Sequence, residues 1–117
     1  MTVERQYQRI SGNWSRYFGR LCLKAFRREG LSVEVLLSVY DRQHGLCALT
    51  GVPLTCTLER GVVCKTNASI DRITPGGPYT EDNIQLVCVA INKLRVDLSL
   101  NEFVDWCRKV SDHAVRK

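Results

Sequence analysis

The stretch TPGGPYTEDN, residues 74–83, constrains the fold of this chain more than any other. Because proline fixes φ and lacks a backbone N–H, a segment with two Pro and two Gly cannot continue a helix or a central strand. We therefore expect a loop here. The preceding residues, 46–73, are short runs rich in Val, Thr and Cys that are broken by turns, which is typical of strands. The following run, IQLVCVAINKLRVDL, predicts a short strand that leads directly into a helix.

Two helices are predicted before this region. Residues 14–28 place apolar side chains on one face and basic side chains on another, as in an amphipathic helix. Residues 33–44 predict a second helix, because Ser32 is a suitable N-cap and Gly45 a suitable C-terminal stop. The apolar face of the first helix consists of Trp14, Phe18, Leu21, Cys22 and Ala25.

A further helix is predicted at the other end of the chain. Ser99 and Glu102 have the spacing of a capping box, which opens a helix over residues 101–113. Its apolar residues recur at helical spacing, so we expect them to be buried against the rest of the domain. They are Phe103, Trp106, Cys107 and Val110.

Positive charge is concentrated in the first predicted helix and the residues before it. The net charge of the chain is +5, yet the first 28 residues hold seven Lys and Arg against one acid, so the remainder sums to −1. Such a segment indicates a surface for a polyanion such as nucleic acid, and the alternative is a solubilising helix face. The candidate nucleic-acid contacts on this helix are Arg16, Arg20, Lys24 and Arg27.

Length and composition favour one small cytoplasmic domain. A chain of 117 residues supports a single core. No run reaches the ~18 apolar residues of a membrane span, and the start MTVERQYQRI lacks the apolar segment of a signal peptide. Because the chain lacks a signal peptide, we expect its six cysteines to be reduced. No Cys-x-x-Cys pair is present, so we expect most of them to be small buried apolar residues.

Residues 67–95, NASIDRITPGGPYTEDNIQLVCVAINKLR, contain the most specific pattern in the chain. An Asp lies at the end of the predicted strand, the Gly/Pro loop follows, Asn83 precedes an apolar run, and Asn92 is followed by basic residues in the predicted helix. This order resembles the HNH nuclease family, whose ββα-metal core has an Asp-His-Ile strand end, a loop, an Asn, a hydrophobic strand and a helix with an Asn or His. With the preceding CALTG, which resembles the family's lead-in, the resemblance covers roughly residues 43–107.

The resemblance implies a divalent cation at the end of the strand. Asp71 and Asn92 stand at the family's metal-ligand positions, and their oxygen atoms suit Mg²⁺ or Mn²⁺. Asn83 stands where the family's Asn ties down the loop and orients the base. On the residues alone, a strand-end Asp also serves as a loop cap, and an Asn on an amphipathic helix is ordinarily solvated. The basic residues that follow Asn92, and that we expect to contact nucleic acid, are Lys93 and Arg95.

The sequence departs from the family at its general base. Asp71 is followed by Arg72, so the chain reads Asp-Arg-Ile, the pattern of a phage-type variant of the family. Arginine stays protonated and cannot accept a proton from water, but it can clamp a phosphate or form an ordinary salt bridge with Asp71, Glu81 or Asp82. The two histidines of the chain, His44 and His113, lie outside the motif. Two alternatives follow. Either another base or a metal-bound hydroxide activates the attacking water, or the protein has lost the ability to cleave DNA and still binds it.

The cysteine positions also depart from the family. Cys47 and Cys88 stand where many HNH proteins have Cys-x-x-Cys knuckles, each without its second Cys. Two thiolates cannot close a tetrahedral site, and although Cys56 and Cys64 could complete four ligands, their spacing follows no known zinc pattern, so we do not expect structural Zn²⁺.

Together these patterns predict a compact α+β domain, with a basic helical segment at 1–45 and an HNH-like ββα-metal core with a C-terminal helix at 46–117. The function they favour is a metal-dependent DNA endonuclease that hydrolyses phosphodiesters, contacts mainly the DNA backbone, is phage-encoded and acts in the cytoplasm of a bacterial host. The alternative is a decayed HNH fold that acts as a DNA-binding, regulatory or inhibitory protein. A protein-interaction module without a nucleic-acid role is disfavoured by the concentrated N-terminal charge.

Overall fold

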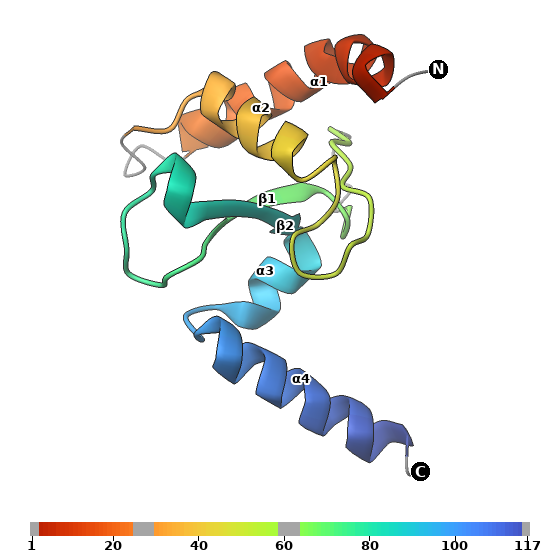
Figure 1. Cartoon of the computed structure of the whole chain (residues 1–117), viewed down its shortest axis with the longest axis vertical. Helices are drawn as coiled ribbons and strands as arrows, with labels where there is room; N and C mark the ends of the chain where they lie inside the picture. Colours follow the sequence, from red (N-terminus) through yellow and green to blue (C-terminus); the bar gives the residue numbers. More distant parts are fainter. Residues whose placement is uncertain (1–2, 25–29, 59–63, 116–117) are drawn as a thin grey trace.

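The computed structural model describes residues 3–24, 30–58 and 64–115, with the side chains of the first helix described from residue 13 to residue 23 (Figure 1). The described chain is α+β, with four α-helices and a two-stranded antiparallel sheet. None of these helices combines the length and the apolar character that crossing a membrane would require. In chain order the elements are α1 (Val3–Lys24), α2 (Val33–Arg42), β1 (Ala68–Arg72), the 3-10 turn η1 (Glu81–Asn83), β2 (Ile84–Cys88), α3 (Val89–Arg95) and α4 (Leu100–Val115).

The sheet forms the middle layer of the domain. β1 and β2 pair antiparallel with Ile70 opposite Leu86, and the chain turns directly from β2 into α3, as the sequence predicts. α2 packs on β2 and α1 lies over α2, whereas α3 packs on both strands from the other side (Figure 1). The end of β1 and the start of the 74–83 loop therefore lie beside α3.

An aromatic cluster joins the N-terminal helices to the sheet. Trp14 and Phe18 of α1 and Tyr40 of α2 are buried, and the ring centroids of Trp14 and Tyr40 lie 4.4 Å apart. Aromatic pairs of this kind contribute about 0.5–1.5 kcal/mol beyond the area that they bury. The same core contains Ile84 and Leu86 of β2. The two segments that the sequence divides near residue 45 therefore share one hydrophobic core.

The strands expected between residues 46 and 58 did not form, and that prediction is wrong. The segment makes isolated bridges, Leu46 with Pro53 and Thr55 with Asn67. Its backbone closes into a compact turn, in which the N–H of Gly51 donates to the carbonyl of Cys47 at 2.9 Å. The Gly and Pro residues in the run favour this turn over an extended strand.

α4 begins at the predicted capping box, but its apolar stripe is not packed against the domain as predicted. Ser99 Oγ accepts from the N–H of Glu102 at 3.2 Å, and Glu102 Oε1 accepts from the N–H of Ser99 at 3.3 Å, so the capping box is formed. Only Phe103 of the expected stripe is buried, whereas Trp106 is 56% exposed and Val110 is 67% exposed. The prediction of a buried stripe is wrong because α4 projects away from the body after its first turn (Figure 1).

Candidate functional site

The 74–83 loop is held in shape by Asn83. Its Oδ1 accepts from the N–H of Thr74 at 3.1 Å, and its Nδ2 donates to the carbonyl of Pro78 at 2.8 Å. A Cβ on Gly77 would lie 2.7 Å from Asn83 Nδ2, so only glycine leaves room for this brace. The structure thus places Asn83 under the loop, and it does not line the cavity described below.

Asp71 and Arg95 form a buried ion pair. Asp71 is 6% exposed and Arg95 is 1% exposed, and Arg95 Nη1 donates to Asp71 Oδ2. Gln85 Nε2 donates to the same oxygen at 2.9 Å. Among the described residues, both side-chain hydrogen bonds to the Asp71 carboxylate therefore go to Oδ2. A buried carboxylate needs such partners, because water no longer solvates its charge.

The burial of Arg95 corrects one prediction. Its Nε donates to the carbonyl of Leu98 at 3.0 Å, and its Nη2 donates to the carbonyl of Ile73 at 3.0 Å. All three nitrogens of the guanidinium are thus bonded within the domain. The side chain ties the end of α3 to β1 and cannot reach a DNA phosphate in this conformation. This structural role of Arg95 could not be predicted from the run of basic residues, because arginine is usually exposed.

Asn92 lies next to β1, as the resemblance implies. Its Nδ2 donates to Ser69 Oγ at 2.6 Å and to the carbonyl of Ile70 at 3.3 Å. Because these two bonds use the amide nitrogen, the amide oxygen is the atom that remains to accept or to coordinate. Asn92 is thus half-buried and held by β1, which differs from the solvated Asn that an amphipathic helix ordinarily carries.

Arg72 turns toward the loop. Its Nη1 donates to the carbonyl of Gly77 at 3.1 Å, and its guanidinium carbon lies 4.7 Å from the centroid of the Tyr79 ring. The salt bridges considered from the sequence are not formed among the described residues, because Asp71 pairs with Arg95 and Glu81 pairs with Arg42 at 3.8 Å. Arg72 is therefore a cation held by neutral partners, which leaves its charge available to an anion.

Asp71, Arg72 and Asn92 line one cavity between β1, the loop and α3, which we call the β1–α3 cavity. Its volume is about 180 Å³. Three residues predicted from the motif line it, although they come from two elements that are about 20 positions apart in the chain. It also contains Asp97, which the sequence pattern missed because an Asp just after a helix carries no specific signal. The lining residues are Ile70, Asp71, Arg72, Pro75, Gly76, Tyr79, Asn92, Val96 and Asp97.

The turn that brings Asp97 to the cavity has an unusual backbone. Val96, which caps α3, has a φ of 50°, a left-handed conformation that β-branched residues rarely adopt. The N–H of Val96 donates to the carbonyl of Asn92 at 3.3 Å, and the carbonyl of Leu98 accepts from Arg95. These bonds stabilise the strained turn, so Asp97 is held at the edge of the cavity by backbone geometry.

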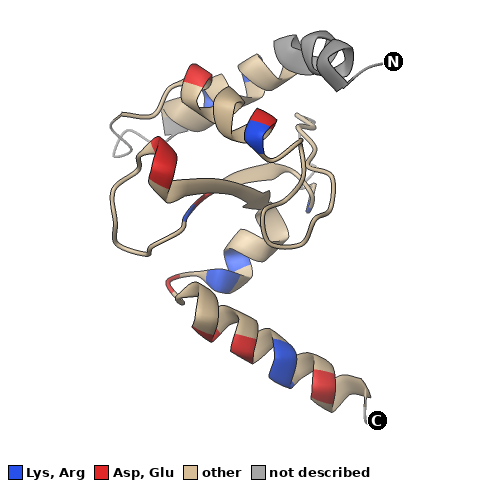
Figure 2. Cartoon of the chain, viewed as in Figure 1, with Lys and Arg blue, Asp and Glu red and all other residues tan. Residues whose placement is uncertain are grey.

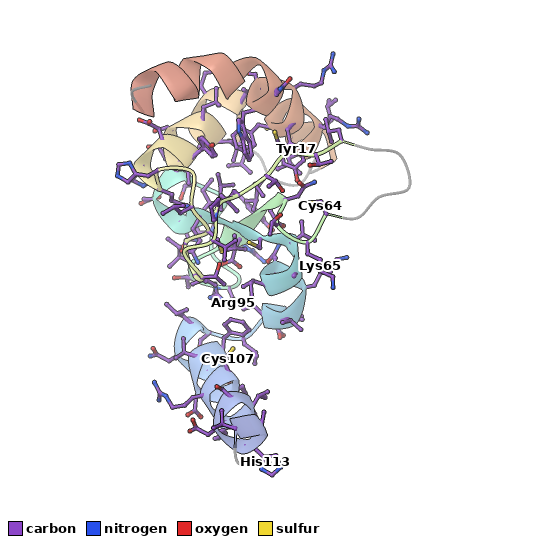
Figure 3. The ribbon with its side chains drawn as sticks, turned by 90° about the vertical axis from the view of Figure 1, so that its right-hand side faces the viewer. Tyr17, Cys64, Lys65, Arg95, Cys107 and His113 are labelled. Atoms are coloured by element: carbon purple, nitrogen blue, oxygen red, sulfur yellow. The ribbon has the colours of Figure 1, made fainter. Side chains whose placement is uncertain are left out.

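No histidine lines the cavity. The lining residues include neither His44, which follows α2, nor His113. Figure 3 shows His113 at the far end of α4 from Arg95. The acidic side chains that line the cavity are Asp71 and Asp97.

The remaining predicted DNA contacts lie on α1 and α3, while further Lys and Arg residues lie on α2 and α4 (Figure 2). Arg16 and Arg20 are exposed on α1, and Lys93 is exposed on α3. Because α1 and α3 lie on opposite sides of the sheet, the α1 residues and the β1–α3 cavity face different directions. The side chain of Lys24, at the end of α1, and the whole of Arg27 lie outside the described residues.

Of the six cysteines only Cys47 and Cys88 are buried, so the prediction that most of them are buried is wrong. The N–H of Cys88 donates to Cys47 Sγ at 3.3 Å, and both residues are buried. Cys64 lies elsewhere, near Thr55 and Thr66, whose hydroxyls hydrogen-bond its sulfur and lower the pKa of the thiol to about 7. Within the described part of the chain, no three His, Cys, Asp or Glu side chains are grouped so that they could hold a metal ion.

Comparison of the chain with models of known families, with curated proteins and with solved structures gives no match.

Proposed function

We propose that the protein is a divalent-metal-dependent endonuclease whose active site is the β1–α3 cavity. One observation carries the proposal: Asp71, Arg72 and Asn92, the residues singled out by the HNH-like motif, line a single cavity in the fold. The elements around these residues follow one another as β1, loop, β2 and α3, which is the order of a ββα core. A cavity lined by carboxylate, amide and guanidinium groups is suited to a cation and a phosphate together.

The donor set fits Mg²⁺ or Mn²⁺. A carboxylate oxygen of Asp71 and the amide oxygen of Asn92, which both line the cavity, would hold the ion. Mg²⁺ is usually bound by one or two carboxylates and keeps several waters, so a small protein donor set is sufficient. The bonds from Gln85 and Arg95 to Asp71 Oδ2 are the outer contacts that orient a ligating carboxylate. The bound ion would neutralise charge on the scissile phosphate.

The residues of the chain supply the rest of the chemistry. In the proposed step the oxygen of a water attacks phosphorus, the bond from phosphorus to the leaving sugar oxygen breaks, and that oxygen takes a proton from solvent to leave as a hydroxyl. The Asp97 carboxylate accepts the proton of the attacking water, the role that a histidine has in the family. Arg72, whose partners among the described residues are the neutral Gly77 and Tyr79, exchanges them for a phosphate oxygen. Outside the cavity, Lys93 of α3 is the proposed contact to the same DNA segment, whereas Arg16 and Arg20 of α1, which face another direction, would contact DNA away from the cut site.

One observation favours a second function, binding without cleavage. Arg95 already neutralises the Asp71 carboxylate, and no histidine lines the cavity. A decayed nuclease core would keep this ion pair for folding and would bind DNA through its exposed basic residues. The two proposals differ in whether DNA is cut.

Nicking of supercoiled plasmid DNA separates the two functions. The wild type is incubated with Mg²⁺, Mn²⁺ or EDTA, together with Asn92→Ala, Asp97→Asn and the control Asp105→Asn, which removes an exposed carboxylate on α4. Asp71→Ala is a poor test, because it leaves Arg95 buried without its partner and can abolish folding. The endonuclease proposal expects metal-dependent nicking that falls at least about tenfold in both cavity variants and not in the control. DNA binding in every variant with no nicking in the wild type would establish the second function.

A further inference from the structure

α4 carries an apolar stripe that the rest of the described chain leaves exposed. A helix advances about 100° per residue, so Phe103, Trp106, Cys107 and Val110 lie along one side of α4. Only Phe103 is buried, whereas Trp106 and Val110 are more than half exposed. In a helix of 16 residues, tertiary packing normally supplies most of the stability, because isolated helices of this length are marginal in water. The stripe therefore needs a partner.

The charges beside the stripe identify that partner. Glu102 and Lys109 lie on the same flank of the stripe, at nearly equal distances along the helix before and after Trp106. If a second α4 packed in parallel about a two-fold axis, this flank would face the opposite flank of the partner helix, and Glu102 would not meet Lys109. If it packed antiparallel, each Glu102 would face the Lys109 of the other copy, and the two-fold axis would make this contact twice.

Lys109 is placed to make this contact. Its Nζ lies 3.1 Å from Asp105 Oδ2 and 4.7 Å from the centroid of the Trp106 ring. Its side chain is 60% exposed, so solvent screens the pair with Asp105 and leaves room for a second carboxylate. The lysine thus already lies at the edge of the apolar stripe, where a flanking ion pair of a helix dimer belongs.

We propose that the protein forms a homodimer in which α4 packs antiparallel against α4 of a second copy, with Trp106 near the two-fold axis. A helix of 16 residues is about 24 Å long, so this interface is smaller than that of most permanent dimers. We therefore expect a reversible dimer in the micromolar range. The proposal is independent of whether the protein cuts DNA.

Sedimentation of the full chain from about 1 to about 300 µM tests the dimer, since this range brackets micromolar association. The wild type is expected to shift from monomer to dimer, and Trp106→Glu to remain monomeric. Asn101→Glu, which adds the same charge on the opposite side of α4, is the matched control and is expected to dimerise as the wild type does. A Trp106→Glu variant that still dimerises would overturn the proposal. A wild type that stays monomeric over the whole range would also overturn it, and would favour a different protein as the partner of this stripe.

Charge exchange tests the antiparallel arrangement. Glu102→Lys and Lys109→Glu should each weaken self-association at least about tenfold, because like charges then face each other twice. Glu102→Gln keeps the capping box and separates loss of the cap from charge repulsion. An equimolar mixture of Glu102→Lys and Lys109→Glu should recover dimerisation, because each contact again joins opposite charges. A mixture that associates no better than the separate variants contradicts the antiparallel register.

Discussion

Breaking the buried ion pair between Asp71 and Arg95 should be among the most destabilising changes in this domain. Arg95→Met removes the bond to Asp71 Oδ2 and the bonds to the carbonyls of Leu98 and Ile73. The Asp71 carboxylate, 6% exposed, then keeps Gln85 as its side-chain partner among the described residues. Leaving one member of a buried pair without its partner costs about 3–5 kcal/mol, a large share of the ~5–15 kcal/mol that stabilises a typical domain.

A double-mutant cycle isolates the pair. Asp71→Asn keeps an acceptor for Arg95 and removes the charge, so it should cost about 1.5–3 kcal/mol. The double variant Asp71→Asn, Arg95→Met has no unpaired buried charge, and we expect it to be more stable than the sum of the single changes predicts by at least about 2 kcal/mol. Urea unfolding followed by tryptophan fluorescence gives each free energy of unfolding, with Trp14 buried in the core as the reporter.

The control for the cycle is an exposed pair in the same domain. Arg42 and Glu81 are about half exposed and 3.8 Å apart, so Arg42→Met should cost less than about 1 kcal/mol. Additive effects in the Asp71–Arg95 cycle would refute the reasoning. The same would follow from an Arg95→Met variant that is no less stable than Arg42→Met.

Three further results are expected. Replacing Arg16 and Arg20 by Glu should weaken binding to duplex DNA of any sequence and reduce the log–log salt slope by about 2, as measured by fluorescence anisotropy at several salt concentrations, whereas an unchanged slope would place the interface elsewhere. Arg72→His should lower the metal-dependent nicking rate, because it removes the cation proposed to contact the phosphate while Asp97 remains the base; a higher rate, with a new inflection near the ordinary histidine pKa in its pH profile, would show that a base is what the site lacks. The hydrogen bonds of Thr55 and Thr66 lower the pKa of Cys64 to about 7, so its alkylation rate should rise as pH increases through 7, and Thr55→Val should move that inflection to higher pH; mass spectrometry of the modified peptide would show whether it does.

The sequence predicted the elements whose residues interact locally. The capping residue Ser32, the periodicity around Trp14 and Phe18, and the proline and glycine residues of the 74–83 loop each act over a few positions, and the structure confirms them. The loop is expected from composition, and Asn83 lies under it as the motif suggested. Local signals of this kind are readable from a single chain.

The parts that were missed depend on contacts that are distant in the chain. From the sequence, Arg95 is predicted to be a surface cation, and only the structure shows that β1 places Asp71 beside it. Asp97 reaches the cavity only because Val96 adopts a left-handed backbone conformation, which nothing in a Val residue predicts. The stripe of α4 has the periodicity of a buried face, but periodicity does not indicate whether the covering surface belongs to the same chain or to another.

The most direct test of the proposed nuclease is whether a divalent cation occupies the β1–α3 cavity. Electron paramagnetic resonance of Mn²⁺ titrated with the full chain measures free and bound ion without requiring DNA. We expect one Mn²⁺ per chain, bound at least about tenfold more weakly by Asn92→Ala and equally well by Asp105→Asn, because a change in a metal ligand or its support typically costs 10–100-fold in affinity. Absence of bound Mn²⁺ in the wild type, or equal binding by Asn92→Ala, would contradict a metal site formed by Asp71 and Asn92.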